Sequence, residues 1–136
     1  MLLGYWTHAG VDAVITDAVG PGPRAIHRRS SFVPDYDFHD AEIHLRYMRS
    51  GRRLEYMGDW HTHPTGPPML SRKDRRTLAV IATHAPARAP TPVMAIFAGR
   101  RTWRLTVWRG MLRPPSVERK RGVVLAVATL RVKLFG

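Results

Sequence analysis

The sequence contains no cysteine, few acidic residues and no long apolar run. Without cysteine the chain can form neither disulfides nor a thiolate metal site, which suits a reducing compartment. No apolar stretch reaches the ~18 residues of a membrane-spanning helix, because Arg131 and Lys133 interrupt the segment 123–135. No basic segment followed by an apolar one precedes the first strand pattern, as it would in a secretory signal. We therefore expect a cytoplasmic protein that does not associate with a membrane.

Basic residues outnumber acidic residues by more than two to one. The 22 Lys and Arg against 10 Asp and Glu give a formal net charge of +12. Such a charge is compatible with nucleic-acid binding, because neutralising phosphates drives that binding. However, the basic residues are scattered in twos and threes, and no base-stacking aromatics are interleaved with them. An acidic protein substrate, attracted by the positive field, explains the charge at least as well, so nucleic acid is the less favoured partner.

The order of strand and helix patterns predicts a mixed α/β (α+β) fold. At 136 residues and 44% hydrophobic content, the chain can bury a core and is not typical of disordered proteins. Segments rich in branched and aromatic residues predict strands. These are residues 1–8, 11–19, 24–33, 54–63, 93–98, 102–108 and 123–135. Helical patterns cover 35–50 and 71–84, while 85–92 and 113–121 are expected to be irregular. This arrangement indicates a curved sheet sandwiched by helices.

Both expected helices carry an apolar face. In the first helix, apolar residues recur at three- and four-residue steps, which predicts one buried stripe. This stripe consists of Phe38, Ala41, Leu45 and Met48. Asp35 or Asp37 can cap the start of this helix, and Gly51 fits its end. In the second helix, the residues expected to face inward are Leu78, Ile81 and Ala82.

The segment 60–64 reads Trp-His-Thr-His-Pro and places two histidines one residue apart. Alternate side chains of a strand share a face, so His61 and His63 are expected to point the same way. A seven-residue loop then leads to Ser71 and, three residues later, to Asp74. Two imidazoles and one carboxylate leave a tetrahedral ion one open position, which is typical of a catalytic zinc site.

Structural roles also fit the residues around this pattern. Ser71 followed three positions later by Asp74 is a capping-box pattern, and one pair of residues can both cap a helix and serve a site. Trp60 and Thr62 point away from the histidine face and are expected in the core.

The spacing His-x-His, seven residues, Ser, two residues, Asp resembles the JAMM motif of the JAB/MPN metalloprotease family. The flanks resemble its bacterial branch: Leu2-Leu3-Gly4-Tyr5 resembles an early strand, 16–23 the next strand and turn, and 31–35 the entry to the central helix. The resemblance runs from Met1 to about Trp108. It implies a single JAB/MPN-like domain over 1–136, in which 109–136 form a C-terminal extension or a closing strand.

The resemblance implies a role for each residue of the motif. The family includes zinc isopeptidases that cut ubiquitin-like proteins from their targets. By resemblance, His61, His63 and Asp74 bind Zn²⁺, whose bound water attacks the substrate carbonyl. Ser71 would stabilise the oxyanion that forms. The loop after the ligands, which contains Pro64 and Gly66, would border a groove for the extended C-terminal tail of the substrate.

The general base of the family does not match any residue of this sequence. It is a glutamate a few residues before the strand that begins at Leu2, and Met1 stands just after that position. We therefore expect that the natural chain starts upstream and that the present sequence is catalytically weakened. Asp59 shares the strand face of His61 at roughly 6.6 Å and is the nearest substitute in sequence, although a poor geometric match. Glu55 has the same strand parity as His61 but lies about 20 Å away along the strand. Two other carboxylates, Glu42 and Glu118, lack positional support.

The leading interpretation is a bacterial zinc metallo-isopeptidase that cleaves ubiquitin-like or C-terminally conjugated proteins. By resemblance, its partners would include homologues of activating and conjugating enzymes. The first alternative is a catalytically inactive MPN module that binds a partner without cutting it. The second is a basic nucleic-acid-binding domain, whose affinity would depend steeply on salt. The sequence carries no signal for the oligomeric state.

Overall fold

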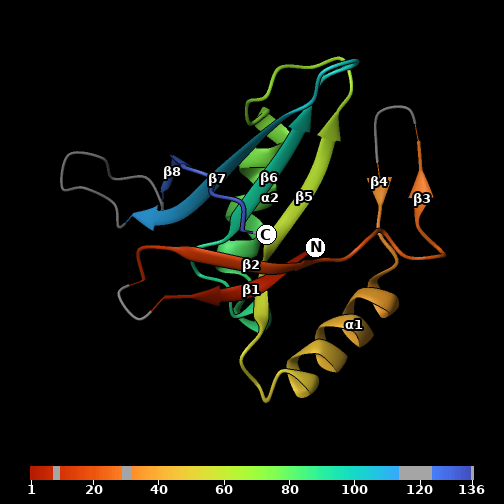
Figure 1. Ribbon diagram of the computed structural model, residues 1–136, viewed down its shortest axis with the longest axis vertical. Coiled ribbons are helices and arrows are strands. Elements are labelled where there is room, and N and C mark those ends of the chain that lie inside the picture. Colours follow the sequence, from red (N-terminus) through yellow and green to blue (C-terminus); the bar gives the residue numbers. More distant parts are fainter. Residues whose placement is uncertain (8–9, 29–31, 114–123, 136) are drawn as a thin grey trace. The chain divides into compact units, whose positions relative to one another are not determined.

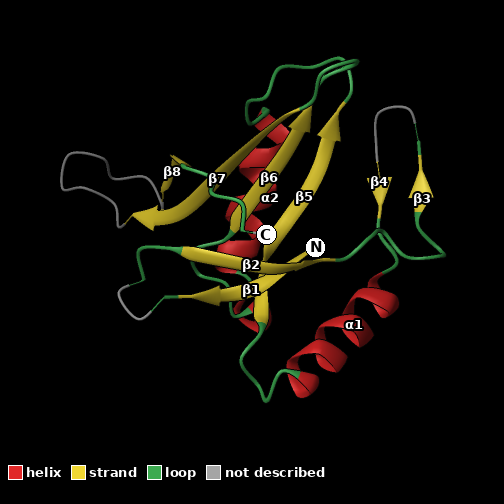
Figure 2. Cartoon of the chain, viewed as in Figure 1, coloured by secondary structure: helices red, strands yellow, loops and turns green. Residues whose placement is uncertain are grey.

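A computed structural model describes residues 1–7, 10–28, 32–113 and 124–135. The chain divides into two compact units, residues 1–57 and 58–136, and each is described by itself. Together they contain helices and strands in the mixed α+β composition that the sequence predicts (Figure 2). The segment 114–121, expected to be irregular, lies outside the described residues.

The first unit contains two strand pairs and one long helix (Figure 1). Strand β1 (Leu2–Trp6) pairs antiparallel with β2 (Ala13–Ala18). The short strands β3 (Ile26–His27) and β4 (Phe32–Val33) also pair antiparallel, and α1 (Tyr36–Arg49) follows them. A small core of buried residues connects β1 to its neighbours. Its members are Met1, Leu3 and Val19, and the half-buried Phe38, Ile43 and Tyr56 pack against them.

The N terminus of α1 is fixed by the predicted cap. The side chain of Asp35 accepts a hydrogen bond from the Phe38 amide. Asp35 is buried, and its Oδ1 lies 3.0 Å from Nη2 of Arg24. The same guanidinium nitrogen reaches Asp37 at 2.7 Å. Hydrogen bonding from Arg24 holds the pKa of Asp35 below its ordinary value, so the carboxylate stays ionised and continues to cap the helix. At the other end, Gly51 follows the helix with φ +67°.

Two predictions for the first unit are wrong. The segment 24–33 is not one strand but contains two paired strands of two residues each. The prediction failed because no glycine, proline or asparagine lies between them to indicate a break. The predicted apolar stripe of α1 is not buried as a set, because α1 contains no buried residue and packs on the core through Phe38 and Ile43. The other members of the stripe are exposed: Ala41, Leu45 and Met48.

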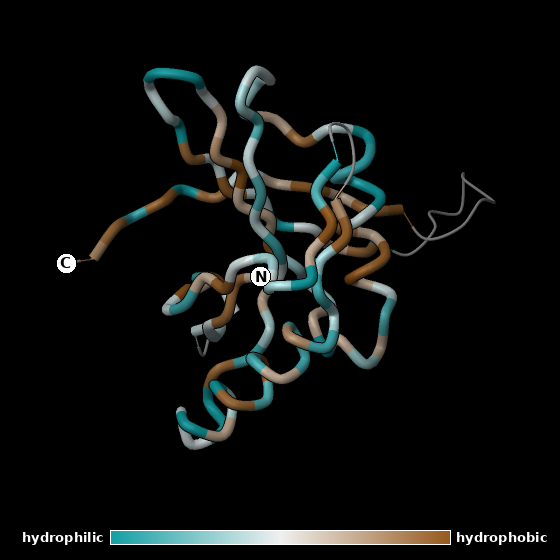
Figure 3. The backbone as a smooth tube through the Cα atoms, turned by 90° about the vertical axis from the view of Figure 1, so that its right-hand side faces the viewer, coloured by the Kyte–Doolittle hydropathy of each residue, from teal (hydrophilic) through white to brown (hydrophobic). Residues whose placement is uncertain are grey.

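The second unit is a four-stranded mixed sheet. Strand β5 (Glu55–His63), which enters this unit at Gly58, runs parallel to β6 (Val93–Ala98). Strand β7 (Arg104–Arg113) pairs antiparallel with β6, and β8 (Val124–Leu130) pairs antiparallel with β7. The apolar segment predicted at 123–135 is thus a closing strand within the chain for most of its length. The residues after it, 131–135, alternate between hydrophilic and hydrophobic up to Lys133 and end in two hydrophobic residues (Figure 3).

Helix α2 (Arg72–Thr83) covers one face of this sheet, where it contacts β7 and β8. Leu78 is fully buried and Ile81 is 8% exposed, as the period of the helix predicts. The core between helix and sheet consists of Leu70, Leu78, Met94, Ile96 and Ala98. A short 3-10 helix, η1 (Ala85–Ala87), begins the segment that was expected to be irregular.

Two further details of the second unit differ from expectation. Strand β7 begins two residues later than predicted and extends five residues further, to Arg113, because its far half pairs with β8. Thr62 is exposed and does not lie in a core, whereas Trp60 is half-buried and packs edge-on against Phe97 at 6.4 Å. Among the described residues, neither long helix has the length and hydropathy to cross a bilayer.

Candidate metal centre

Strand β5 brings the two histidines of the motif to one face. In the register with β6, His61 stands opposite Ile96 and His63 opposite Ala98. Both β6 residues are buried in the core beneath α2, so the two imidazoles lie on the helix side of the sheet. Their rings are 4.8 Å apart and tilted by 53°. The predicted strand parity is therefore observed.

Helix α2 supplies the carboxylate from its first turn. Ser71 is the N-cap and Asp74 the N3 residue, and they form a reciprocal capping box. The Ser71 amide donates to Asp74 Oδ2 at 2.7 Å, and the Asp74 amide donates to Ser71 Oγ at 3.2 Å. The Asp74 side chain is 11% exposed. A negative charge in the first turn interacts favourably with the helix dipole, and the capping box fixes the direction of this side chain.

Three side chains converge on one point, through two imidazole nitrogens and the two carboxylate oxygens of Asp74. Nε2 of His61 lies 2.9 Å from Nε2 of His63 and 3.3 Å from Oδ1 of Asp74. Nε2 of His63 lies 3.6 Å from Oδ2 of Asp74. Ligand atoms bound to one tetrahedral Zn²⁺ at 2.0–2.1 Å are about 3.3 Å apart, and the three observed separations bracket that value. The residues present therefore fit a metal ion with three protein ligands.

The loop that follows His63 determines which nitrogen of its ring is the donor. Its Nδ1 lies 2.9 Å from the carbonyl oxygen of Pro67, which can only accept, so Nδ1 carries the proton. This leaves the lone pair of Nε2 free to bind a metal. The loop itself is held on its other side, because Thr106 Oγ1 donates to the Pro68 carbonyl at 2.9 Å. The sequence could not name these partners, since both acceptors are backbone atoms.

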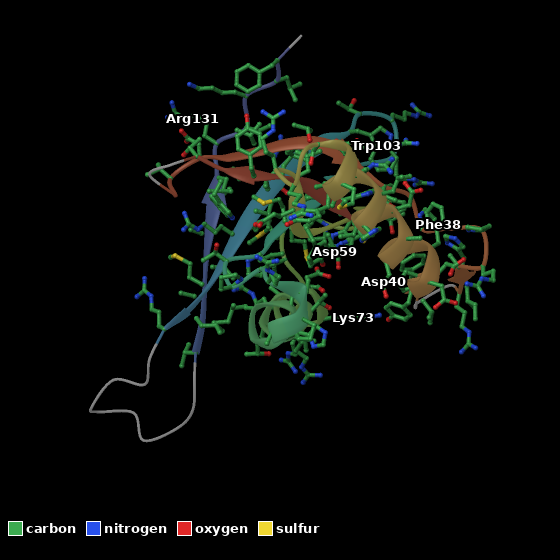
Figure 4. The ribbon with its side chains drawn as sticks, turned by 90° about the horizontal axis from the view of Figure 1, so that it is seen from below. Phe38, Asp40, Asp59, Lys73, Trp103 and Arg131 are labelled. Carbon is green, nitrogen blue, oxygen red and sulfur yellow. The ribbon has the colours of Figure 1, made fainter. Side chains whose placement is uncertain are left out.

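The environment of His61 favours the neutral imidazole. Burial lowers its pKa from the ordinary value of 6.5, and the negative charges of Asp74 and, more weakly, Asp59 oppose that change. A neutral imidazole is the form that ligates metals. Figure 4 labels Asp59 on β5 and Lys73 in the first turn of α2, the two elements that carry the metal-facing atoms.

The structure also places the other residues named from the sequence. The Ser71 hydroxyl accepts from the Asp74 amide, which leaves its own proton free to donate to another group. Gly66 lies against His63, since a Cβ added to it would stand 3.4 Å from that of His63. Pro64 is exposed. Asp59 is half-buried and shares the face of His61, and Glu42 is paired with Arg46 in the first unit. Glu118 lies outside the described residues.

The sequence of this chain is similar to a probable metalloprotease and to two isopeptidases. Residues 9–113 match the family described as prokaryotic homologues of the JAB domain. The chain is 45% identical over 114 residues to a probable metalloprotease, y4qB, of Sinorhizobium fredii, and this match covers 81% of the chain and 68% of the relative. It is 29% identical over 99 residues to a CD-NTase/cGAS isopeptidase of Enterobacter hormaechei, a match that covers 73% of the chain and 53% of the relative.

A second CD-NTase/cGAS isopeptidase, from Vibrio cholerae, is 31% identical over 68 residues, half of this chain and 44% of the relative. The chain thus spans about two thirds of the first of these relatives and about half or less of the isopeptidases. The family match covers most of the chain and contains all three metal-facing residues and Ser71. The chain belongs to the family of prokaryotic homologues of the JAB domain.

Proposed function

We propose that this protein is a zinc-dependent peptidase or isopeptidase that acts on ubiquitin-like or other C-terminally conjugated proteins. The observation that carries the proposal is the convergence of two imidazole nitrogens and one carboxylate within 4.8 Å of one another. Three nitrogen and oxygen ligands with a further position open are typical of catalytic rather than structural zinc. The names of the relatives, a metalloprotease and two isopeptidases, point to the same class of reaction.

Zinc bound here would supply Lewis acidity and a water nucleophile at neutral pH. The side chains of this chain have separate tasks. His61, His63 and Asp74 hold the ion, and the proton on Nδ1 of His63 keeps its ligating nitrogen free. Ser71 presents a hydroxyl beside the ligands, fixed by the helix start, as a donor to the oxygen on which charge develops. One such donor typically contributes about 3 kcal/mol to the transition state.

The general base is the part of the mechanism that the resemblance places before Leu2. Asp59 is the described carboxylate on the histidine face of β5, and it is the substitute to test within this chain. A base must reach the proton it removes directly or through one water. Activity is therefore measured on residues 1–136, on the Asp59→Asn variant and on a longer version that includes upstream residues.

The first experiment measures bound metal after purification and after dialysis against zinc. We expect about one zinc per chain in the wild type and in His44→Ala, an exposed histidine on α1. His61→Ala should lose most of this zinc, because two ligands of three remain. Equal zinc content in His61→Ala and His44→Ala would overturn the metal site. So would a wild-type melting temperature that a chelator does not change.

The second experiment measures cleavage of a fusion through the C terminus of a ubiquitin-like protein. Zinc-dependent cleavage that His63→Ala abolishes would support the peptidase. If the chain and its longer version both bind zinc and neither cleaves, the catalytically inactive binding module replaces the enzyme. The same proposal includes homologues of activating and conjugating enzymes as partners, since such enzymes make the conjugates that an isopeptidase cuts. It also includes a cytoplasmic location.

A further inference from the structure

A shallow groove lies beside the metal centre in the second unit. Its volume is about 280 Å³, and it runs between the loop after the histidines and the turn that joins β6 to β7. The residues that line it are Gly66, Pro68, Ala98, Gly99, Thr102 and Arg104. Apart from Arg104, these residues are small and uncharged, which leaves room for an extended polypeptide.

The groove is built on the hydrogen bonds that position His63. The carbonyl of His63 accepts from the Gly99 amide at 3.2 Å, which joins the ligand to the β6–β7 turn. The loop on the opposite wall is attached to His63 through the Pro67 carbonyl and to β7 through Thr106. A chain lying in this groove therefore passes next to a metal-facing residue.

Arg104 stands at a defined distance from that residue. It pairs with Ala98 of β6, and Ala98 pairs with His63 of β5. Neighbouring strands are 4.7–4.9 Å apart, so Arg104 lies about 10 Å across the sheet from His63. An extended substrate advances about 3.3 Å per residue, which corresponds to about three residues. A side chain three positions from the scissile bond would reach this guanidinium.

Arg104 is exposed, and no acidic residue that the structure describes forms an ion pair with it. The same holds for Arg100 and Arg101 of the adjoining turn. Three guanidinium groups within five residues, none of them in an ion pair with a described acidic residue, raise the local positive potential. Their arrangement is that of a surface that receives an anion.

The charge of the whole chain is concentrated in this unit. Residues 1–57 contain seven Lys or Arg and seven Asp or Glu, whereas residues 58–136 contain fifteen and three. The net charge of +12 therefore belongs to the unit that carries the metal-facing residues. Basic residues are also frequent in the first turns of α2, although the dipole at a helix N terminus disfavours positive charge. Four of them are exposed there: Arg72, Lys73, Arg75 and Arg76.

We propose that Arg104 determines specificity by binding a substrate carboxylate about three residues from the scissile bond. The inference rests on the proposed peptidase function, because it is the metal centre that makes this groove a substrate groove. The carboxylate belongs to an Asp or Glu side chain or to the free C terminus of the substrate. A polypeptide is favoured over nucleic acid because the groove leads to a site whose chemistry is amide hydrolysis and because no aromatic side chain lines it.

Binding is tested by fluorescence anisotropy with three labelled nine-residue peptides at low salt. The first carries one internal Glu and an amidated end, the second has Gln and a free C terminus, and the third has Gln and an amidated end. An exposed charge-assisted contact should favour a carboxylate peptide over the neutral peptide by about three- to tenfold. Arg104→Gln should remove this preference, and Arg104→Lys should restore part of it. Arg131→Gln, which changes the net charge equally, should keep it.

Each outcome has a defined meaning. Preference for the internal Glu or for the free terminus identifies the source of the carboxylate. Equal binding of all three peptides, or a preference that survives Arg104→Gln, would overturn the proposal. A single-stranded oligonucleotide that binds more tightly than the peptides, and loses affinity with Arg104→Gln, would replace it with nucleic-acid recognition. Because binding is read without cleavage, an Arg104-dependent preference in a protein without zinc or activity would count against the peptidase function alone.

Discussion

Ser71 and Asp74 offer the sharpest separation of folding from metal binding. They close the same helix start, each accepting the backbone N–H of the other. Only Asp74 also faces the two imidazole nitrogens, at 3.3 and 3.6 Å. We predict that Ser71→Ala and Asp74→Asn lower stability by similar amounts without metal, and that only Asp74→Asn removes stabilisation by zinc.

The magnitudes follow from the two roles. Loss of a serine N-cap costs about 1 kcal/mol, and loss of a first-turn negative charge about 0.3–1 kcal/mol. Asparagine keeps an oxygen that can accept from the Ser71 amide, so the cap itself largely survives in Asp74→Asn. A zinc concentration of about one hundred times Kd adds about 2.7 kcal/mol to a chain with an intact site.

Thermal unfolding with and without zinc is the assay. One kcal/mol corresponds to about 3–6 °C, depending on whether the whole chain or residues 58–136 alone melt together. Without metal we therefore expect Ser71→Ala to melt about 3–6 °C below wild type and Asp74→Asn about 1–6 °C below it. Zinc should raise the Tm of the wild type and of Ser71→Ala by about 9–16 °C, and that of Asp74→Asn by far less. A full zinc shift in Asp74→Asn would refute its role as a ligand, and loss of the shift in Ser71→Ala would show that cap and site cannot be separated.

Three further variants test the packing around the site. Gly58→Ala should destabilise the chain by more than about 3 kcal/mol in chemical denaturation, since Gly58 has φ +143° and a Cβ there would meet a backbone carbonyl of β6 at 1.8 Å. A neutral result would contradict the β5–β6 pairing. Leu78→Ala should cost about 2–5 kcal/mol and Val80→Ala, exposed on the same helix, under about 1 kcal/mol; equal losses would contradict the core. Because Arg24 lowers the pKa of Asp35 below 3.8, the ionised carboxylate stabilises the fold above that pH, and this contribution disappears as the pH falls through the lowered pKa. The stability difference between wild type and Asp35→Asn should therefore be largest near neutral pH and shrink in acid, and a difference that grows in acid would exclude the ion pair as its cause.

The metal-facing group was predictable because its geometry is local. Strand parity places His61 and His63 on one face, and the capping pattern places Asp74 in the first turn of a helix. What joins them is tertiary, namely the packing of α2 on the histidine side of the sheet. The apolar period of α2 predicted its buried face, and the observed core joins Leu78 of that face to Ile96 of β6, which pairs with His61.

Other features could not be read from residue types. The acceptors Pro67 and Pro68 act through their carbonyl oxygens, which every residue possesses, so no sequence pattern marks them. The position of Arg104 depends on two strand registers, and only the observed pairing shows that it lies across from His63. The predicted strands 93–98 and 102–108 would have indicated this position only if their antiparallel pairing and the parallel β5–β6 pairing had both been assumed.

Helix α1 shows the limit of periodicity. Its apolar residues fit one stripe, yet Phe38 and Ile43 contact the core while Leu45 remains 37% exposed. A repeat of three and four residues indicates which side chains can share a face. The neighbouring strand decides which face is used, and that information is absent from the helix sequence. The wrong prediction at 24–33 has a similar origin, because strand propensity alone does not distinguish one long strand from two short strands that pair with each other.

The backbone contacts of the loop after the histidines have an evolutionary consequence. His63 is oriented by the Pro67 carbonyl, and the loop is fastened to β7 by the Pro68 carbonyl. Neither contact depends on the side chain at the accepting position. Substitutions along the groove can therefore accumulate without disturbing the tautomer of the ligand, provided that the path of the loop is kept. The side chains that line the groove and the geometry of the His-His-Asp group can therefore change independently of one another.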